Sequence, residues 1–306
     1  MTGKHLLKMS DLTQADIMEI LALADQMKFN QQHKLSHRAL EGKALGMIFT
    51  KASTRTRVSF ETGIFQLGGH AVNLTPADAQ FGRGEPIEDT ANVLSRYVDG
   101  LMIRTFAQQD AEDFAKYGGI PVINGLTDDE HPCQILADLM TIREHLATLA
   151  GLTVCWIGDG NNVCCSLISG ALTCGMKVRV ACPKGYEPRA EILDKAQTNP
   201  HFALTRDPRE AAEGANVVFT DVFASMGQEE DAQKRLADFA GYQVNGELLS
   251  LCAKNVIVQH CLPAHRGEEI TAEAFAAHAK EIYDEAENRL HAQKAVMALL
   301  MGGEPA

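Results

Sequence analysis

Two guanidinium groups and three hydroxyls are concentrated in the consecutive residues Ser53-Thr54-Arg55-Thr56-Arg57. The apolar run 44–49 before them has the character of a buried strand, and Phe60, Ile64 and Leu67 recur after them at helical spacing. The segment is therefore predicted to open a helix, where unpaired backbone N–H groups and the helix dipole favour an anion. Arginine adds charged, bidentate donors that match phosphate oxygens, so the segment predicts a phosphate cradle. The plainer alternative is a Ser/Thr N-cap followed by surface arginines.

A second polar group, His131-Pro132-Cys133-Gln134, opens the longest helical pattern near the middle of the chain, which runs towards Leu149. Proline suits the first position of a helix. The positive end of the helix dipole disfavours an imidazolium, so we expect His131 to stay neutral and donate a hydrogen bond to a carbonyl oxygen. A histidine that only caps the helix is the alternative. Arg104 ends the apolar strand predicted at 100–104, at a sheet edge where it can join the cradle.

Two further polar segments, one acidic and one with a cysteine, follow predicted strands. Asp221 and Ser225 lie four residues apart in the run Asp-Val-Phe-Ala-Ser-Met-Gly, so a carboxylate and a hydroxyl can receive an ammonium group, unless Asp221 only caps a helix. His260-Cys261-Leu262-Pro263 ends another strand, which predicts an exposed Cys261 at the strand tip. His260, Cys261 and His265 also resemble zinc ligands, but no Cys-x-x-Cys pair completes a tetrahedral set, so we expect no metal site.

The turn Gly158-Asp159-Gly160 resembles the start of a dinucleotide-binding fingerprint because it follows a predicted strand and opens a helix. Val163 stands where the third glycine is required, and the segment 180–184 lacks the acidic residue that holds a ribose. Nicotinamide binding is therefore not expected. Asn161 and Asn162 still place polar side chains at the carboxyl edge of a sheet, where open α/β sheets bind small ligands.

The composition is that of a globular protein of two domains. The chain has 306 residues, 45% of them hydrophobic and 22% charged, and no apolar run long enough to span a bilayer. A net charge of −12 opposes general binding to nucleic acid. Eight scattered cysteines, several within apolar runs, are typical of buried thiols in a reducing compartment, so no disulfides are expected. The N-terminal residues lack the apolar segment of a signal peptide, which predicts a cytoplasmic protein.

Short apolar runs alternate with longer amphipathic ones along the chain, which is the pattern of parallel sheets flanked by helices. We therefore predict an α/β fold of two domains, 1–148 and 149–285, each a parallel-sheet α/β sandwich, joined by the central helix. The C-terminal stretch 286–306 has helical spacing and is expected to pack back on the first domain. The strands are expected at 44–49, 71–74, 100–104, 121–124, 153–157, 177–182, 216–220 and 256–259.

Four motifs, Ser-Thr-Arg-Thr-Arg, His-Pro-Cys-Gln, Asp-x-x-x-Ser-Met-Gly and His-Cys-Leu-Pro, occur in this order and closely resemble those of the ornithine carbamoyltransferases over essentially the whole chain. The first motif also resembles that of the aspartate carbamoyltransferases, so it implies carbamoyl phosphate only. The Ser-Met-Gly run and Cys261 imply ornithine as the acceptor, since the aspartate enzymes lack the former and have another residue in place of the latter. Enzymes that act on putrescine or acylated ornithine look less similar because they lack the Ser-Met-Gly pattern.

The resemblance implies a role for each matching residue, with carbamoyl phosphate bound by 1–148 and ornithine by 149–285. Phosphate contacts are implied for Ser53, Thr54, Arg55 and Thr56, with Arg57 supporting the loop. Contacts to the carbamoyl group are implied for Arg104, His131, Pro132, Cys133, Gln134 and Arg289. Cys261 and Leu262 would lie beside the reacting amine and carbamoyl phosphate, and ornithine would be bound by Asn162, Asp221, Ser225 and Met226. Gln80 matches a residue at a subunit boundary, which implies a homotrimer with shared active sites.

These roles imply a mechanism that needs neither a metal nor an organic cofactor. A free δ-amine has a pKa near that of lysine, about 10.4, so only about one molecule in a thousand is nucleophilic at neutral pH. We hypothesise that Cys261, oriented by Asp221, positions and deprotonates this amine. Thr56, Arg104 and His131 would stabilise the oxygen of the tetrahedral intermediate, and the leaving phosphate would meet the cradle. Carbamoyl transfer to putrescine or aspartate, and a phosphate-binding protein without activity, are the alternatives.

Overall fold

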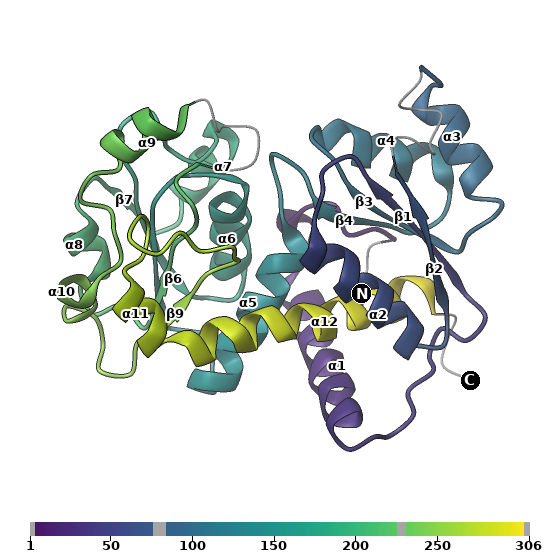
Figure 1. Ribbon diagram of the computed structural model, residues 1–306, viewed down its shortest axis with the longest axis horizontal. Helices are drawn as coiled ribbons and strands as arrows, with labels where there is room; N and C mark the ends of the chain where they lie inside the picture. The colour runs from purple at the N-terminus through teal and green to yellow at the C-terminus, as the bar shows by residue number, and fades with distance from the viewer. Residues whose placement is uncertain (1–3, 76–83, 225–230, 303–306) are drawn as a thin grey trace. The chain divides into compact units, whose positions relative to one another are not determined.

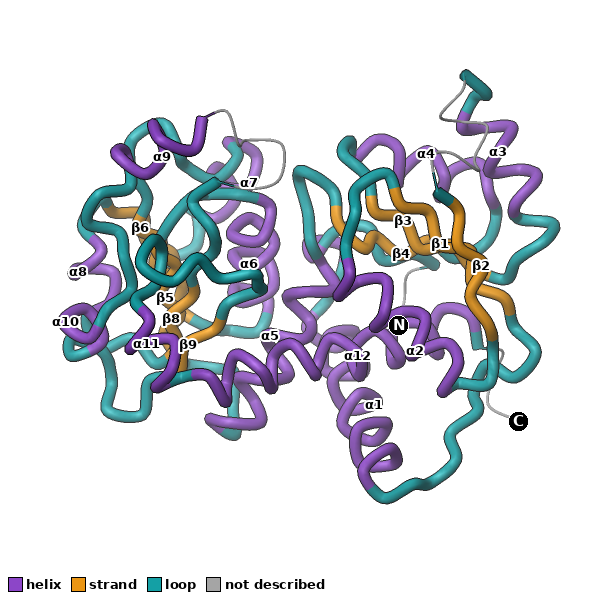
Figure 2. The backbone as a smooth tube through the Cα atoms, in the orientation of Figure 1, coloured by secondary structure: helices purple, strands orange, loops and turns teal. Residues whose placement is uncertain are grey.

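The computed structural model describes residues 4–75, 84–224 and 231–302. The chain divides into two units, of which unit 1 comprises Met1–Ala137 and Arg289–Ala306 and unit 2 comprises Asp138–Asn288. Each unit is built on one parallel sheet, and Figure 2 shows the strands gathered in these two sheets. The predicted fold class is therefore confirmed. Both boundaries between the units fall inside helices, α5 (Pro132–Leu146) and α12 (Ala279–Met301).

Unit 1 is organised around a four-stranded sheet. The four strands are β1 Ala44–Phe49, β2 His70–Leu74, β3 Gly100–Arg104 and β4 Val122–Leu126. Besides parts of α5 and α12, the helices of the unit are α1 Gln14–Gln32, α2 Thr54–Gln66, α3 Ile87–Leu94, α4 Gln108–Gly118 and a 3-10 helix at Met9–Asp11. The strand order is β2-β1-β3-β4, all parallel. β1 and β3 are buried along nearly their whole length, which is why both read as unbroken apolar runs. Helices α3 and α4 pack on one face of the sheet, and Figure 1 shows α1, α2 and α12 on the other.

Unit 2 is organised around a five-stranded sheet. The five strands are β5 Thr153–Ile157, β6 Lys177–Ala181, β7 Phe202–Thr205, β8 Val217–Phe219 and β9 Ile257–Gln259. Besides parts of α5 and α12, the helices of the unit are α6 Asn162–Thr173, α7 Ala190–Ala196, α8 Pro208–Ala212, α9 Ala232–Asp238, α10 Gly246–Leu249 and α11 Ala272–Ala277. The strand order is β7-β6-β5-β8-β9, again all parallel. Ala211, Leu248 and Phe275 bury one face of the sheet beneath α8, α10 and α11, and Figure 1 shows α6 and α7 on the opposite face.

Each sheet has one place where the chain changes its direction of winding. From β1 the chain passes to β2 on one side and later to β3 on the other, and from β5 it passes to β6 and later to β8. Ligands of open α/β sheets bind outside the carboxyl ends of the strands at such switch points. Ser53 follows β1 and Arg104 ends β3, while Asn161 follows β5 and Asp221 follows β8. The topology therefore places both groups of candidate residues where a ligand is expected.

Three elements differ from the prediction. The central helix ends at Leu146 rather than near Leu149, because Ala147 takes a left-handed backbone conformation with φ of 64°. Helix α12 begins at Ala279 rather than at 286, since the mostly polar residues of its first two turns hide the helical period. Strand β7 is absent from the predicted strands because it is short and none of its four residues is buried. Within residues 4–75, 84–224 and 231–302, no helix is long and apolar enough to cross a membrane.

Candidate active site

The predicted cradle forms the first turn of α2, directly after β1. Ser53 is the N-cap of the helix, and its hydroxyl accepts the backbone N–H of Thr56 at 3.2 Å. Arg57 lies along the exposed face, where its Nε donates to Glu61 Oε1 at 3.0 Å. Thr54 and Arg55 are exposed, whereas the side chain of Thr56 is fully buried. Ser53 thus caps the helix as the plainer alternative states, and Thr56 points inward to further polar groups.

Two buried guanidinium groups meet at the hydroxyl of Thr56. Arg289 Nη2 donates to Thr56 Oγ1 at 2.8 Å and Arg104 Nη1 donates to it at 3.4 Å, and both arginines are at most 5% exposed. Arg104 comes from the end of β3 and Arg289 from α12, so the fold joins segments that are far apart in the sequence. Two positive charges beside a helix N-terminus make this an electropositive site suited to a phosphate.

His131 immediately precedes α5, and Pro132 takes the first helical position. The imidazole is buried, and burial together with the charges of Arg289, Arg104 and Arg55 holds its pKa well below the ordinary value of 6.5. His131 is therefore neutral at physiological pH and can donate a hydrogen bond from one ring nitrogen. The sequence predicts this neutral form from the helix dipole, whereas burial and three arginines produce it.

The loop before α5 is held by polar side chains that the sequence does not single out. Thr127 Oγ1 donates to Gln108 Oε1 at 2.8 Å and accepts the backbone N–H of Glu130 at 3.1 Å. In the same loop Asp128 forms an ion pair with Lys51, which precedes the cradle and is 8% exposed. These contacts fix the start of α5 relative to β1 and β4. A single polar residue in a loop gives no periodic or motif signal, so sequence reasoning misses all of them.

Cys133 and Gln134, on the first turn of α5, are both buried. The Cys133 thiol donates to the backbone carbonyl of Asn124 at 3.3 Å, and burial raises its pKa to about 12. Cys133 is therefore a protonated thiol that ties α5 to β4, a packing role that the resemblance does not imply.

Asp221 is the centre of the candidate residues in unit 2, and it is 7% exposed. Its Oδ2 accepts Asn161 Nδ2 at 2.8 Å, while its Oδ1 accepts the Cys261 thiol at 3.1 Å and the backbone N–H of Val222 at 2.8 Å. Asn161 is the N-cap of α6, and Asn162 bonds instead to the backbone of the following residue. The resemblance implies Asn162 alone, so Asn161 is an additional residue that orients the carboxylate.

Cys261 is partly exposed beyond the end of β9, rather than exposed at a strand tip as predicted. Burial and the negative charges of Asp221, Glu285 and Asp138 raise the pKa of its thiol well above the ordinary value of 9.0. The thiol therefore stays protonated at neutral pH and donates to Asp221. In this pair the carboxylate is the group that can accept a proton, which changes the role that the sequence-based mechanism gives to Cys261.

His260 stabilises the backbone of the segment that carries Cys261. Its Nδ1 accepts the backbone N–H of Leu262 at 2.9 Å, and its Nε2 lies 3.0 Å from Glu269 Oε1, with both side chains fully buried. These partners place the proton of the neutral ring on Nε2. Leu262 has φ of 60°, a left-handed conformation that is strained for leucine, so the bond to His260 stabilises a backbone that the chain alone disfavours.

In the described part of the chain, two groups of side chains have ligand atoms close enough to hold a metal ion. The first group is Asp221, His260 and Cys261. The second group is His265, Glu268 and Glu269. In the first group both ring nitrogens of His260 already have partners, and in the second Glu269 is one of those partners. A metal would have to displace these bonds, so neither group is preorganised for one.

Packing explains the Gly158-Asp159-Gly160 turn in unit 2. A Cβ on Gly160 would lie 2.1 Å from the backbone nitrogen of Pro188, a separation that no side chain can adopt. Asp159 forms an ion pair with Arg235, and burial raises the pKa of Asp159 to about 6. The residues that resemble a nucleotide fingerprint therefore serve close packing and a buried ion pair.

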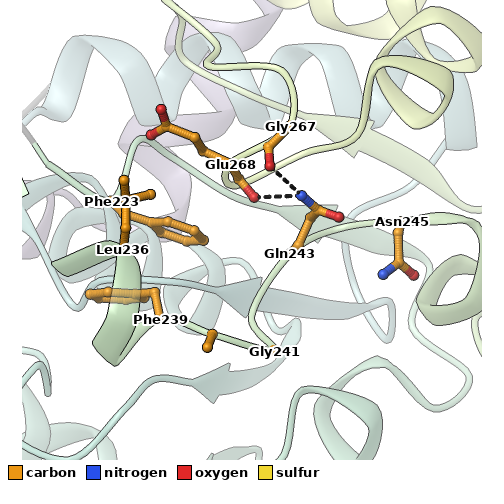
Figure 3. Close-up of a pocket in the computed structure, with 9 residues that line it drawn as sticks. Phe223, Leu236, Phe239, Gly241, Gln243, Asn245, Gly267 and Glu268 are labelled. Carbon is orange, nitrogen blue, oxygen red and sulfur yellow. Dashed lines mark hydrogen bonds between the residues drawn. The ribbon is translucent and has the colours of Figure 1, made fainter. Parts of the chain in front are cut away.

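A cavity of about 330 Å³ lies in unit 2. Figure 3 shows Phe223 and Phe239 at its wall and the Gln243 amide bonded to the carbonyls of Gly267 and Glu268. The two phenyl rings are stacked, with their centroids 4.6 Å apart. No candidate site residue in the described part of the chain lines this cavity. It is separate from the group around Asp221, although Phe223 follows that residue closely in the sequence.

Three predicted site residues, Gln80, Ser225 and Met226, lie outside the described residues. Their expected places at a subunit boundary and around ornithine stay predictions. The other predicted residues form two groups, one at the switch point of each sheet.

Comparison with known proteins gives a consistent result along the whole chain. Residues 4–144 match the carbamoyl-P binding domain of the aspartate/ornithine carbamoyltransferases, and residues 150–300 match the Asp/Orn binding domain. The ornithine carbamoyltransferase of Carboxydothermus hydrogenoformans is 54% identical over 305 residues, which cover 98% of each chain. That of Gloeobacter violaceus is 53% identical, covering 97% of this chain and 96% of its own.

Solved structures of ornithine carbamoyltransferases have the same fold. The enzyme from Pyrococcus furiosus is similar with a TM-score of 0.93 and 49% identity, covering 98% of each chain. An enzyme from Campylobacter jejuni described as anabolic has a TM-score of 0.91 and 37% identity, covering 97% of this chain and 99% of its own.

Proposed function

The chain belongs to the aspartate/ornithine carbamoyltransferase family, and we propose that it transfers the carbamoyl group of carbamoyl phosphate to the δ-amine of L-ornithine. The products are L-citrulline and phosphate. Relatives that share about half of its residues over the whole chain are named for this activity. The reaction belongs to arginine biosynthesis, in keeping with the relative described as anabolic, and the same residues serve the reverse reaction.

The observation that carries this proposal is the group of positive and neutral donors around Thr56. The N–H groups of the first turn of α2 and Arg55 bind the phosphate. Arg104, Arg289 and His131 donate to the carbamoyl oxygen, where negative charge develops as the tetrahedral intermediate forms. His131 is suited to this role because a neutral ring donates a hydrogen bond without losing its proton. Gln134 receives the carbamoyl amide.

In unit 2 we assign the proton transfer to Asp221. The δ-ammonium of ornithine gives one proton to the Asp221 carboxylate, and the free amine then attacks the carbamoyl carbon. The new C–N bond forms, the C–O bond to phosphate breaks, and phosphate leaves with the bonding electrons and takes up the second amine proton. Cys261 stays a thiol and orients Asp221 from one side while Asn161 orients it from the other. Asn162, Ser225 and Met226 bind the α-amino and carboxylate groups.

We infer that the active form is a homotrimer in the cytoplasm. Val58 and Phe65 are 54% and 76% exposed and lie seven residues apart on one face of α2, the helix that opens with the cradle. Contiguous exposed apolar patches mark protein contacts, and these two side chains support such a contact on this face of α2. Gln80 of a neighbouring copy would complete the phosphate site. The described cysteines are free thiols, as in a reducing compartment.

Phosphate release tests this function against the alternative of a binding protein without activity. The purified chain is incubated with carbamoyl phosphate, with and without ornithine, and phosphate is followed over time. We expect release above the spontaneous rate only when ornithine is present. Release at the spontaneous rate with both substrates present would contradict the proposal and favour a protein that only binds phosphate.

A further inference from the structure

Lys294 on α12 is a fully buried lysine whose partners are all uncharged amides or a ring nitrogen. Within the described chain its Nζ lies 2.8 Å from Gln66 Oε1, 3.1 Å from Gln31 Oε1 and 3.1 Å from His37 Nε2, and it has no carboxylate partner. Burial lowers its pKa to about 8. A buried ammonium without a counter-ion is destabilising relative to an apolar side chain of similar shape. Its presence therefore needs an explanation other than stability.

The face of α12 that carries Lys294 packs closely on α2. A Cβ on Gly63 of α2 would come 2.9 Å from Met297 Cε and 3.2 Å from Lys294 Cγ. Gly63 has no left-handed backbone conformation that would require glycine, and glycine in a helix interior is unfavourable by about 1 kcal/mol relative to alanine. The glycine is thus explained by the close approach of the two helices.

Polar bonds fix α12 to α2 at both ends of the shorter helix. Arg289 of α12 donates to Thr56 in the first turn of α2 at 2.8 Å, and Lys294 donates to Gln66, its last residue, at 2.8 Å. The close contact at Gly63 lies between these bonds. Two directional bonds at separate points determine both the rotation and the axial position of α12 on α2.

We propose that Lys294 is a positioning residue for the phosphate half of the active site, because it fixes the register of α12 on α2 and so holds Arg289 against Thr56. Gly63 has no side chain and so allows α2 and α12 to approach as closely as this arrangement requires. Lys294 acts through Arg289 and not on the substrate. This inference rests on the proposed function, in which Arg289 already donates to the carbamoyl oxygen of bound carbamoyl phosphate, so its displacement weakens the binding of that substrate.

The test is the substitution Lys294→Met, which keeps an unbranched side chain, shorter by its terminal atom, and removes the charge. The partners Gln31, Gln66 and His37 are themselves partly exposed and can bond to water. We expect an unchanged or higher midpoint of urea unfolding, together with a rise of about tenfold in KM for carbamoyl phosphate as Arg289 shifts. KM for ornithine should stay within twofold. The matched control is Lys280→Met, at the exposed start of the same helix, which should leave both KM values unchanged.

A double-substitution cycle separates positioning from a general structural role. If Lys294 acts through Arg289, adding Lys294→Met to Arg289→Met should raise KM for carbamoyl phosphate no further. An additional rise of the same size in that background would overturn the proposal, as would an unchanged KM in Lys294→Met alone. Gly63→Ala is an independent variant that should raise the same KM. An inactive wild-type protein would contradict the proposed function instead, so the two failures are distinguishable.

Discussion

Cys261 donates its thiol proton to Asp221, with 3.1 Å between Sγ and Oδ1. The second carboxylate oxygen accepts Asn161 Nδ2 at 2.8 Å, so both oxygens are oriented by side chains. The three residues follow strands β5, β8 and β9, which the sheet places next to one another around β8. The Asp221 carboxylate is therefore held in one orientation, and Cys261 contacts it as a donor.

Asp221→Asn should lower kcat much more than Cys261→Ser. Loss of a general base typically reduces the rate by 10² to 10⁴, and we expect about 10² or more for Asp221→Asn. Serine in place of Cys261 can still donate to the carboxylate, so its kcat should fall by about tenfold or less, with a higher KM for ornithine. Steady-state kinetics at saturating carbamoyl phosphate measures both effects. A larger loss in Cys261→Ser than in Asp221→Asn would assign the base to the thiol.

Arg55→Ala should reduce activity by about 10² to 10³ in kcat, because the leaving phosphate loses a charged donor. The side chain is exposed, so the free energy of unfolding should change by about 0.5 kcal/mol or less. Arg38→Ala is the control, since Arg38 is an exposed arginine paired with Glu41 at 3.3 Å. A folded Arg55→Ala protein with a near-normal kcat would exclude Arg55 from the mechanism.

The stability of unit 2 should depend on the ionisation of Asp159. Burial, opposed by Arg235, raises its pKa from 3.8 to about 6 in the folded protein. At a pH between these two pKa values, Asp159 stays protonated in the folded chain but is deprotonated in the unfolded chain. The contribution of Asp159 to stability therefore decreases as the pH rises. The full change is up to about 3 kcal/mol. The change should be nearly complete at about pH 7, about one unit above the pKa of Asp159 in the folded protein.

Urea unfolding of the wild type and Asp159→Asn at about pH 4.5 and about pH 7.5 measures this effect. The variant lacks the titrating group, so it should lose less stability than the wild type on going to the higher pH. The same pH dependence in both proteins would show that Asp159 has its ordinary pKa when folded.

Gly160→Ala should destabilise the protein strongly, by more than about 3 kcal/mol, because a Cβ would meet the backbone of residues 187–188. Gly246→Ala is the matched control, since a Cβ there meets nothing within 4 Å and the residue lies in the first turn of α10. The control should change the free energy of unfolding by about 0.5 kcal/mol or less. Equal unfolding midpoints for the two variants would contradict the packing explanation of the Gly158–Gly160 turn.

The sequence predicts the fold well where strands are buried on both faces. β1, β3 and β5 read directly as apolar runs, because no alternation interrupts them. β7 is missed because it is a short strand at the sheet edge with no buried residue. The start of α12 is missed because its first turns are mostly polar, so their helical spacing carries no apolar signal.

The site residues that sequence reasoning finds are those in consecutive runs, such as Ser53 to Arg57. It misses Asn161 as the partner of Asp221 and Lys294 as the partner of Gln66, because these contacts join residues 60 and 228 positions apart. It also gives Cys261 the role of deprotonating the amine, because the charges that raise the pKa of the thiol come together only in the fold. Motifs identify the chemistry, whereas tertiary contacts determine which group holds the proton.

The most direct test of the account is an acceptor panel. The purified chain is incubated with carbamoyl phosphate and, separately, with ornithine, putrescine or aspartate, and the carbamoylated product and phosphate are measured together. The account predicts citrulline and phosphate in equal amounts with ornithine and no product with the other two amines. Carbamoylation of putrescine or aspartate in preference to ornithine would contradict the assignment of unit 2 to ornithine.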